Sequence, residues 1–147
     1  MSNSRAKNTV KIMVFGTFDG LHPGHLNFFK QARNLSKKND SFLVISIARD
    51  KNVFRIKGQY PLMDEKKRLY MIKKSRVANR TVLAGLRSHI PHIKKENPDI
   101  IALGYDQRAY VKGLKKGLAN EGIFVKIKRL RPYKQKIYKN RLLRNKR

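Results

Sequence analysis

The feature that most restricts the fold of this chain is a glycine-rich stretch, residues 16–25, with the sequence GTFDGLHPGH. It follows the apolar residues 12–15, which are typical of a buried strand. It precedes residues 26–35, where apolar side chains recur every third position and predict an amphipathic helix. A glycine-rich turn between a first strand and a first helix is where open α/β sheets bind phosphate groups. The stretch therefore predicts an α/β fold with a phosphate-binding turn.

Two histidines, His22 and His25, stand at the expected start of that helix. Pro23 fits the first helical turn, because its missing N–H would have no partner there, and Gly24 lets the backbone approach a ligand closely. A histidine at this place can donate hydrogen bonds to phosphate oxygens and stabilise the charge that develops on them. The candidate nucleotide-binding residues of this stretch are Gly16, Thr17, Phe18, Asp19, His22, Pro23, Gly24 and His25, and the two histidines are also candidate catalytic residues.

A pair of histidines three positions apart is also found on ordinary surfaces and as half of a metal site. A metal site needs three or four protein ligands. The chain has no cysteine, and Asp19 is the only carboxylate close to the pair in the sequence. We therefore predict a nucleoside triphosphate site rather than a metal centre.

The remainder of the chain alternates between segments typical of strands and segments typical of helices. We expect one domain, residues 10–147, after a basic arm at residues 1–9. Residues 53–63 indicate a loop, because Gly58 and Pro61 interrupt them. Strands are predicted at residues 11–15, 42–48, 81–84, 99–103 and 122–128, and helices at residues 23–37, from residue 64, and at residues 88–96 and 109–120. This alternation predicts a doubly wound α/β sheet.

Polar and glycine residues follow two of the predicted strands. Lys51 comes after the second strand, and Gly104 and Asp106 come after the fourth. Ligands of open α/β sheets bind outside the carboxyl ends of the strands, so Lys51 is a candidate catalytic residue that contacts a phosphate. Its alternative is a solvated loop charge. Gly104 allows close approach of the backbone, and Asp106 is either a hydrogen-bond acceptor for a ribose or base amine or the cap of the next helix.

The turn GTFDGLHPGH resembles the G-T-F-D-x-x-H-x-G-H signature of the nucleotidyltransferase superfamily, which includes cytidylyltransferases, pantetheine-phosphate adenylyltransferase and FAD synthases. Residues 47–53, IARDKNV, and 98–107, PDIIALGYDQ, are similar to archaeal-type FAD synthases. The resemblance covers residues 10–144 and implies a Rossmann-like, doubly wound, parallel five-stranded sheet of the HxGH nucleotidyltransferase type, with strand order 3-2-1-4-5. It also implies that Arg68 organises the site or a dimer contact, where the alternative is a surface salt bridge.

In relatives, a pair of hydroxyl residues followed by a basic residue begins a last helix that binds phosphate. The matching residues 139–143 here are KNRLL, so Asn140 replaces the hydroxyls and Arg141 keeps the positive charge. Asparagine still caps a helix well. A cysteine pair that archaeal-type FAD synthases carry before this motif is absent. The resemblance implies a catalytic role for Arg141 and nucleotide contacts for Asn140 and Tyr133, although a tyrosine packed on the sheet is equally compatible with the sequence.

The resemblance implies transfer of a nucleotidyl group from a triphosphate to a phosphorylated acceptor, with Mg²⁺ held mainly by the substrate phosphates. ATP with FMN, giving FAD and pyrophosphate, is the first hypothesis. CTP-dependent transfer to glycerol 3-phosphate or a similar alcohol phosphate is the second. A homodimer is compatible with the family.

The chain is strongly basic, with 36 Lys and Arg against 9 Asp and Glu and a net charge of +27. Such a surface attracts polyanions, including nucleic acid. The excess is either a general property of the source or a functional nucleic-acid contact, and a third hypothesis is a nucleic-acid-binding protein that keeps the fold without catalysis. The sequence has no apolar run long enough to span a membrane and no cysteine, which fits a cytoplasmic enzyme.

Overall fold

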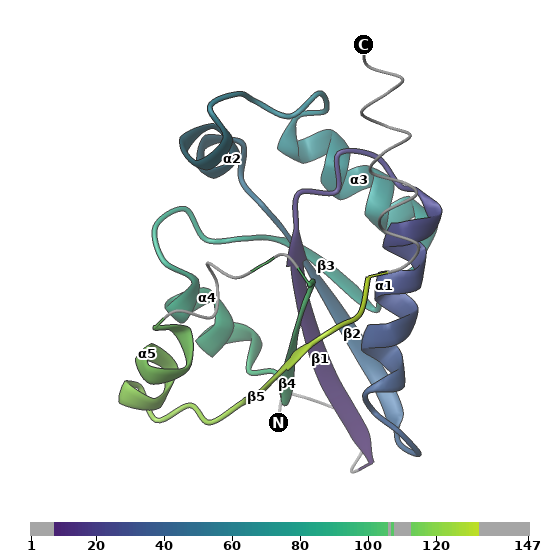
Figure 1. Cartoon of the computed structure of the whole chain (residues 1–147), viewed down its shortest axis with the longest axis vertical. Coiled ribbons are helices and arrows are strands. Elements are labelled where there is room, and N and C mark those ends of the chain that lie inside the picture. Colours follow the sequence, from purple (N-terminus) through teal and green to yellow (C-terminus); the bar gives the residue numbers. More distant parts are fainter. Residues whose placement is uncertain (1–7, 106, 108–112, 133–147) are drawn as a thin grey trace.

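The computed structural model describes residues 8–105, 107 and 113–132 (Figure 1). Its five strands form one parallel sheet in the order β3-β2-β1-β4-β5, which confirms the predicted order. The elements are β1 Thr9–Gly16, α1 Pro23–Asn34, β2 Asp40–Ile47, α2 Asp50–Lys57, α3 Glu65–Ser75, β3 Arg80–Leu83, α4 His89–Glu96, β4 Ile100–Leu103, α5 Leu114–Asn120 and β5 Lys126–Arg129.

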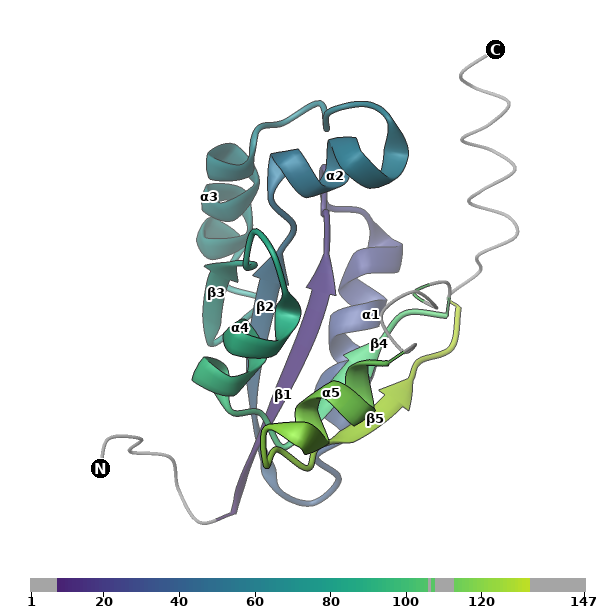
Figure 2. The same cartoon turned by 90° about the vertical axis from the view of Figure 1, so that its left-hand side faces the viewer.

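Helices cover both faces of the sheet, with α1 and α3 on one face and α4 and α5 on the other (Figures 1 and 2). Alternate residues of β1 enter the two cores, so the strand is buried on both sides and its sequence is continuously apolar. One core contains Ile12, Val14, Phe29, Ala32 and Ile72. The other contains Met13, Phe15, Ile93, Leu114 and Leu118.

The direction of winding reverses between β1 and β4, because β2 and β3 lie on one side of β1 and β4 and β5 on the other. The carboxyl ends of all five parallel strands meet at the same edge of the sheet. Loops at such a reversal point form the ligand crevice of open α/β folds. The glycine-rich turn after β1 and Gly104 after β4 both begin at this edge.

The predicted loop at residues 53–63 is wrong for its first five residues, which belong to α2. Only Val53 of this helix is buried, so the sequence has no apolar stripe that would reveal a helix. Gly58, which indicated a break, instead ends the helix in a left-handed conformation with φ of 79°. Its N–H donates to the Phe54 carbonyl at 2.7 Å, and glycine adopts this conformation without a steric penalty.

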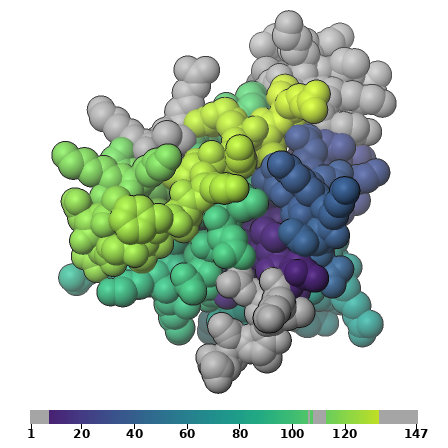
Figure 3. Space-filling view, turned by 90° about the horizontal axis from the view of Figure 1, so that it is seen from below, coloured from purple at the N-terminus to yellow at the C-terminus, as the bar shows by residue number. Residues whose placement is uncertain are grey.

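The other elements lie close to their predicted places. The helix predicted at residues 109–120 is described as α5 from Leu114, and the last strand begins at Lys126 rather than at Gly122. This strand forms an edge of the sheet and crosses the molecular surface between α5 and α1 (Figure 3). Residues 1–7 of the predicted arm and residues 133–147 of the basic tail lie outside the described residues. No helix within the described ranges combines the length and apolar character needed to cross a membrane.

Candidate active site

The two histidines of the glycine-rich turn cap the first helix and hold each other in place. His22 is the N-cap of α1, and its Nδ1 accepts hydrogen bonds from the backbone N–H groups of Gly24 at 3.0 Å and His25 at 3.4 Å. In return, the N–H of His22 donates to Nδ1 of His25 at 3.3 Å. This is a reciprocal capping box, built from histidines in place of the usual Ser or Thr and Glu. Because both Nδ1 atoms accept, each neutral ring carries its proton on Nε2.

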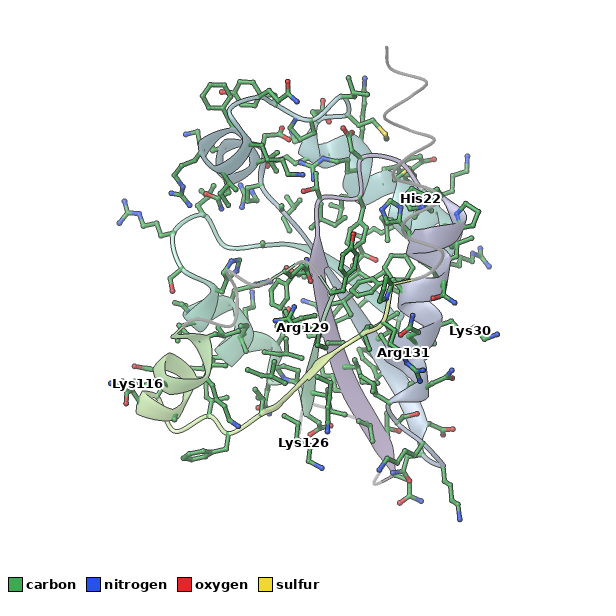
Figure 4. All side chains as sticks on the ribbon, viewed as in Figure 1. His22, Lys30, Lys116, Lys126, Arg129 and Arg131 are labelled. Carbon is green, nitrogen blue, oxygen red and sulfur yellow. The ribbon has the colours of Figure 1, made fainter. Side chains whose placement is uncertain are left out.

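Gly24 is required by the position of the His22 ring. A Cβ at residue 24 would lie 2.7 Å from Cε1 of His22, so any side chain would displace the ring from its capping position. The two imidazole rings stack with centroids 3.7 Å apart, and Phe18 meets His25 edge-on at 5.4 Å. Figure 4 places His22 at the amino end of α1. The HxGH pattern is therefore explained by packing as well as by chemistry.

Both histidines are held neutral. Burial, and secondarily the neighbouring His22, lower the pKa of His25 to about 4, while a hydrogen bond with the Gly20 backbone acts in the opposite direction. Burial also lowers the pKa of His22. The neutral state is the one that the capping box needs, since protonation of Nδ1 would remove its lone pair. The His22 ring is thus a hydrogen-bond donor through Nε2 at the positive end of the α1 dipole.

Asp19 fixes the turn to the segment before α3. Its carboxylate accepts hydrogen bonds from the N–H groups of Leu62 at 2.7 Å and Met63 at 2.8 Å. These bonds span more than forty residues of sequence and clamp the turn three residues before His22. Asp19 was predicted to bind the nucleotide. In the structure its carboxylate holds the glycine-rich turn against the segment before α3.

Arg68 ties the turn to two further helices from inside the protein. Its side chain is 0% exposed, so the alternative of a surface salt bridge is wrong. The guanidinium donates to the Thr17 carbonyl at 2.8 Å, to Oδ1 of Asp50 at 2.6 Å and to the Met63 carbonyl at 2.9 Å. One buried cation thus joins the glycine-rich turn, the start of α2 and the start of α3.

Asp50 and Glu65, the first residues of α2 and α3, are joined by two reciprocal hydrogen bonds between backbone N–H groups and carboxylates. The N–H of Asp50 donates to Oε1 of Glu65 at 2.8 Å, and the N–H of Glu65 donates to Oδ2 of Asp50 at 3.1 Å. Nε of Arg49 also donates to Glu65, at 3.0 Å. Each carboxylate thereby satisfies an unpaired N–H at the other helix's amino end. Lys51 follows in the first turn of α2, where it is exposed to solvent.

The loop after β4 is bound to β1 and β5. The Gln107 side chain donates to the Phe15 carbonyl at 2.8 Å and accepts from the Gly104 N–H at 2.8 Å. Arg129 donates to the carbonyls of Gly104 at 2.8 Å and Tyr105 at 3.3 Å. Gln107 ends the stretch 98–107 that is similar to archaeal-type FAD synthases, but it was not predicted as a site residue by itself. Arg129 was not predicted as a site residue, and no local pattern distinguishes it.

The chain leaving β5 is fastened to α1. Oε1 of Gln31 accepts from the Arg131 N–H at 3.0 Å, and its Nε2 donates to the Arg131 carbonyl at 2.9 Å. Figure 4 shows Arg131 beside α1, the helix that His22 caps. Four predicted site residues, Asp106, Tyr133, Asn140 and Arg141, lie outside the described residues.

A second histidine pair, His89 and His92, lies on α4 against β1 and β2. His92 Nε2 lies 2.8 Å from Oγ of Ser46, and the ring of His89 meets Phe15 edge-on at 5.3 Å. Both side chains are partly buried. Across residues 8–105, 107 and 113–132, no group of three or more His, Asp or Glu side chains is arranged to hold a metal ion.

Comparisons with known proteins agree with this geometry. The Cytidylyltransferase-like family model matches residues 13–141. An FAD synthase of Korarchaeum cryptofilum is 41% identical over 120 residues, 82% of this chain and 80% of that protein. An FAD synthase of Aciduliprofundum boonei is 38% identical over 124 residues, 84% and 80% of the two chains.

A crystal structure described as a lipopolysaccharide core biosynthesis protein from Thermoplasma volcanium superposes with a TM-score of 0.76 and 35% identity, covering 84% of this chain and 98% of that one. The family match begins within β1 and includes the HxGH turn and the other four strands. The chain therefore belongs to the cytidylyltransferase-like family of nucleotidyltransferases.

Proposed function

We propose that this protein transfers AMP from ATP to the phosphate of FMN and releases FAD and pyrophosphate. The observation that carries the proposal is the pair of neutral, mutually capping histidines at the amino end of α1, at the carboxyl edge of the sheet. The choice of ATP and FMN is supported by the 41% and 38% identity to two FAD synthases.

The proposed reaction needs little covalent chemistry from the protein. A phosphate oxygen of FMN attacks the α-phosphorus of ATP, and a new P–O bond forms while the bond from the α-phosphorus to the bridging oxygen breaks. Pyrophosphate leaves with that electron pair. The acceptor phosphate is already a nucleophile, so no general base is required, and the protein contributes positioning and electrostatic stabilisation.

Each side chain has a role in this proposal. The imidazole rings of His22 and His25 donate hydrogen bonds to phosphate oxygens whose charge increases in the transition state. Lys51, exposed at the start of α2, attracts the acceptor phosphate. The turn around the triphosphate is formed by Gly16, Thr17, Phe18, Pro23 and Gly24. The ribose and base are contacted by Gly104, Asp106 and Tyr133. In the tail, the triphosphate is bound by Asn140 and Arg141.

We infer that a divalent metal, Mg²⁺, accompanies the triphosphate and neutralises part of its charge. The part of the chain that the structure describes contains no cluster of carboxylates able to hold it. Mg²⁺ keeps much of its hydration shell and often binds proteins mainly through substrate phosphates, so these residues fit a metal carried in by the nucleotide. We also propose that the protein is cytoplasmic.

CTP-dependent transfer to glycerol 3-phosphate is the second candidate, because the matching family is defined by its likeness to cytidylyltransferases. Two incubations with Mg²⁺ separate the candidates: FMN with ATP, and glycerol 3-phosphate with CTP, each analysed by chromatography. FAD in the first supports the proposal. A CDP-alcohol in the second, with no FAD in the first, would refute it.

Nucleic-acid binding is the candidate from another class, and the net charge of +27 favours it. Lys126, Lys128 and Arg129 are exposed along the edge strand β5, and Lys115 and Lys116 are exposed on α5. We expect weak RNA binding whose affinity falls steeply with salt, because it depends on counterion release. Sequence-selective binding that persists at physiological salt, without pyrophosphate release, would favour this candidate. Size-exclusion chromatography with light scattering tests the homodimer that the family suggests.

A further inference from the structure

Strands β1 and β4 separate before their ends, at the point where the winding of the sheet reverses. The ladder between β1 and β2 runs to the pair Gly16–Ile47. The ladder between β1 and β4 ends two residues earlier, at the pair Val14–Ala102. The parting therefore lies between the turn that carries the histidines and the loop that follows β4. Ligands of open α/β sheets bind at this place.

The side chain of Gln107 spans this parting. Its Nε2 donates to the Phe15 carbonyl on β1, and its Oε1 accepts from the Gly104 N–H beyond β4, both at 2.8 Å. The side-chain amide of Gln107 thus replaces the backbone hydrogen bonds that β1 and β4 would make if their pairing continued by one more step. Without it, a carbonyl and an N–H at this half-buried place would lose these partners.

The same residue also shapes the loop after β4. The backbone N–H of Gln107 donates to the Gly104 carbonyl at 3.1 Å and closes a turn. Arg129, at the end of β5, donates to the same carbonyl at 2.8 Å and to the Tyr105 carbonyl at 3.3 Å. The carbonyl of the peptide that joins Gly104 to Tyr105 is therefore held by the Gln107 backbone and by Arg129 on β5, and the Gln107 side chain links this loop to β1.

We propose that Gln107 is a positioning residue for the nucleotide. It sets the separation of β1 and β4 and the orientation of the Gly104–Tyr105 peptide, and so aligns the loop after β4 with the histidine turn on either side of the bound triphosphate. The inference rests on the nucleotidyltransfer proposed above and does not depend on the identity of the acceptor. Only a neutral amide fits, because the side chain must donate and accept at the same time.

Two variants separate the amide bridge from a simple change of charge. Gln107→Met removes both hydrogen bonds without adding charge. Gln107→Glu keeps the acceptor for Gly104 but loses the donor to Phe15. Gln59→Met, at an exposed glutamine in the turn after α2, is the matched control. For each protein, KM for ATP and for FMN, kcat, the calorimetric Kd of ATP and the thermal midpoint are measured.

We expect both Gln107 variants to raise KM and Kd for ATP by about tenfold, with a smaller change in kcat and in KM for FMN. Gln107→Met loses both hydrogen bonds, whereas Gln107→Glu loses the bond to Phe15 and leaves that carbonyl facing a carboxylate. Gln59→Met should behave like the wild type. A lower thermal midpoint with an unchanged Kd for ATP would show a merely structural role and overturn the inference. A higher Kd for ATP in Gln107→Glu but not in Gln107→Met would also overturn the inference, because it would indicate charge repulsion. A wild-type protein that binds ATP but forms no FAD would overturn the proposed substrates and leave the Kd comparison valid.

Discussion

Replacing His22 by asparagine separates the two roles that the structure gives this residue. As the N-cap of α1, His22 accepts two backbone hydrogen bonds through Nδ1. Asparagine is among the best N-cap residues, so His22→Asn should preserve the cap and the free energy of unfolding. Asparagine cannot place a donor where the imidazole Nε2–H lies. His22→Asn should therefore reduce kcat about a hundredfold, as for loss of one transition-state donor.

His22→Ala removes both roles. Loss of an N-cap costs about 1 kcal/mol of stability, and His22→Ala should combine that loss with the same reduction in kcat. Gly24→Ala tests the geometry independently, because its Cβ would lie 2.7 Å from Cε1 of His22 and displace the ring. It should lower both stability and kcat although the histidine is still present. Lys30→Ala, on an exposed position of α1, is the control (Figure 4).

Urea unfolding followed by circular dichroism gives the stabilities, and a coupled pyrophosphate assay gives kcat. The account requires that His22→Asn and His22→Ala differ in stability and agree in kcat. If His22→Asn turned over like the wild type, the histidine would not be a transition-state donor. If His22→Ala were as stable as the wild type, the capping box would contribute nothing.

Three further predictions concern the buried arginine, pH and the tail. Arg68→Met should lower stability by about 3 kcal/mol, because it leaves the Asp50 carboxylate without its buried partner, and should raise KM for the triphosphate; equal denaturation midpoints would contradict the network. The pKa of His25 is lowered from 6.5 to about 4 in the folded protein, so its contribution to stability is complete above pH 6.5 and is lost as the pH falls toward 4. Urea midpoints measured across that window should show this loss, and His25→Asn should flatten it. Truncation after Arg131 should abolish turnover, and Arg141→Ala should raise KM for the triphosphate. Full activity of the truncated protein would show that the tail is not part of the site.

The parts of this fold that the sequence predicts are those encoded in adjacent residues. The continuously apolar β1 and β2 reveal strands buried on both faces, and the GTFDGLHPGH stretch locates the turn and the start of α1. The helix predicted from residue 64 is α3, and Asp64 is its N-cap, where it accepts from the Lys67 N–H at 2.8 Å. The strand order came from resemblance rather than from periodicity.

The parts that the sequence did not predict depend on contacts between distant residues. Helix α2 has one buried side chain and is stabilised at its start by Glu65, fifteen residues from Asp50. Gln107 bridges to Phe15 across 92 residues, and nothing beside it in the sequence indicates the bond. The reciprocal cap of His22 and His25 is local, but the sequence does not show it, because histidine is not among the usual residues of a capping box.

The central claim, that the histidine turn promotes attack on the α-phosphorus, is tested most directly by following labelled phosphate. The protein is incubated with Mg²⁺, FMN and ATP labelled at either the α- or the γ-phosphorus, and the products are separated by chromatography. The account predicts that α-label appears in FAD, that γ-label appears only in pyrophosphate, and that both transfers slow about a hundredfold in His22→Asn. Transfer of γ-label to the acceptor, or FAD formation that His22→Asn leaves unchanged, would contradict it.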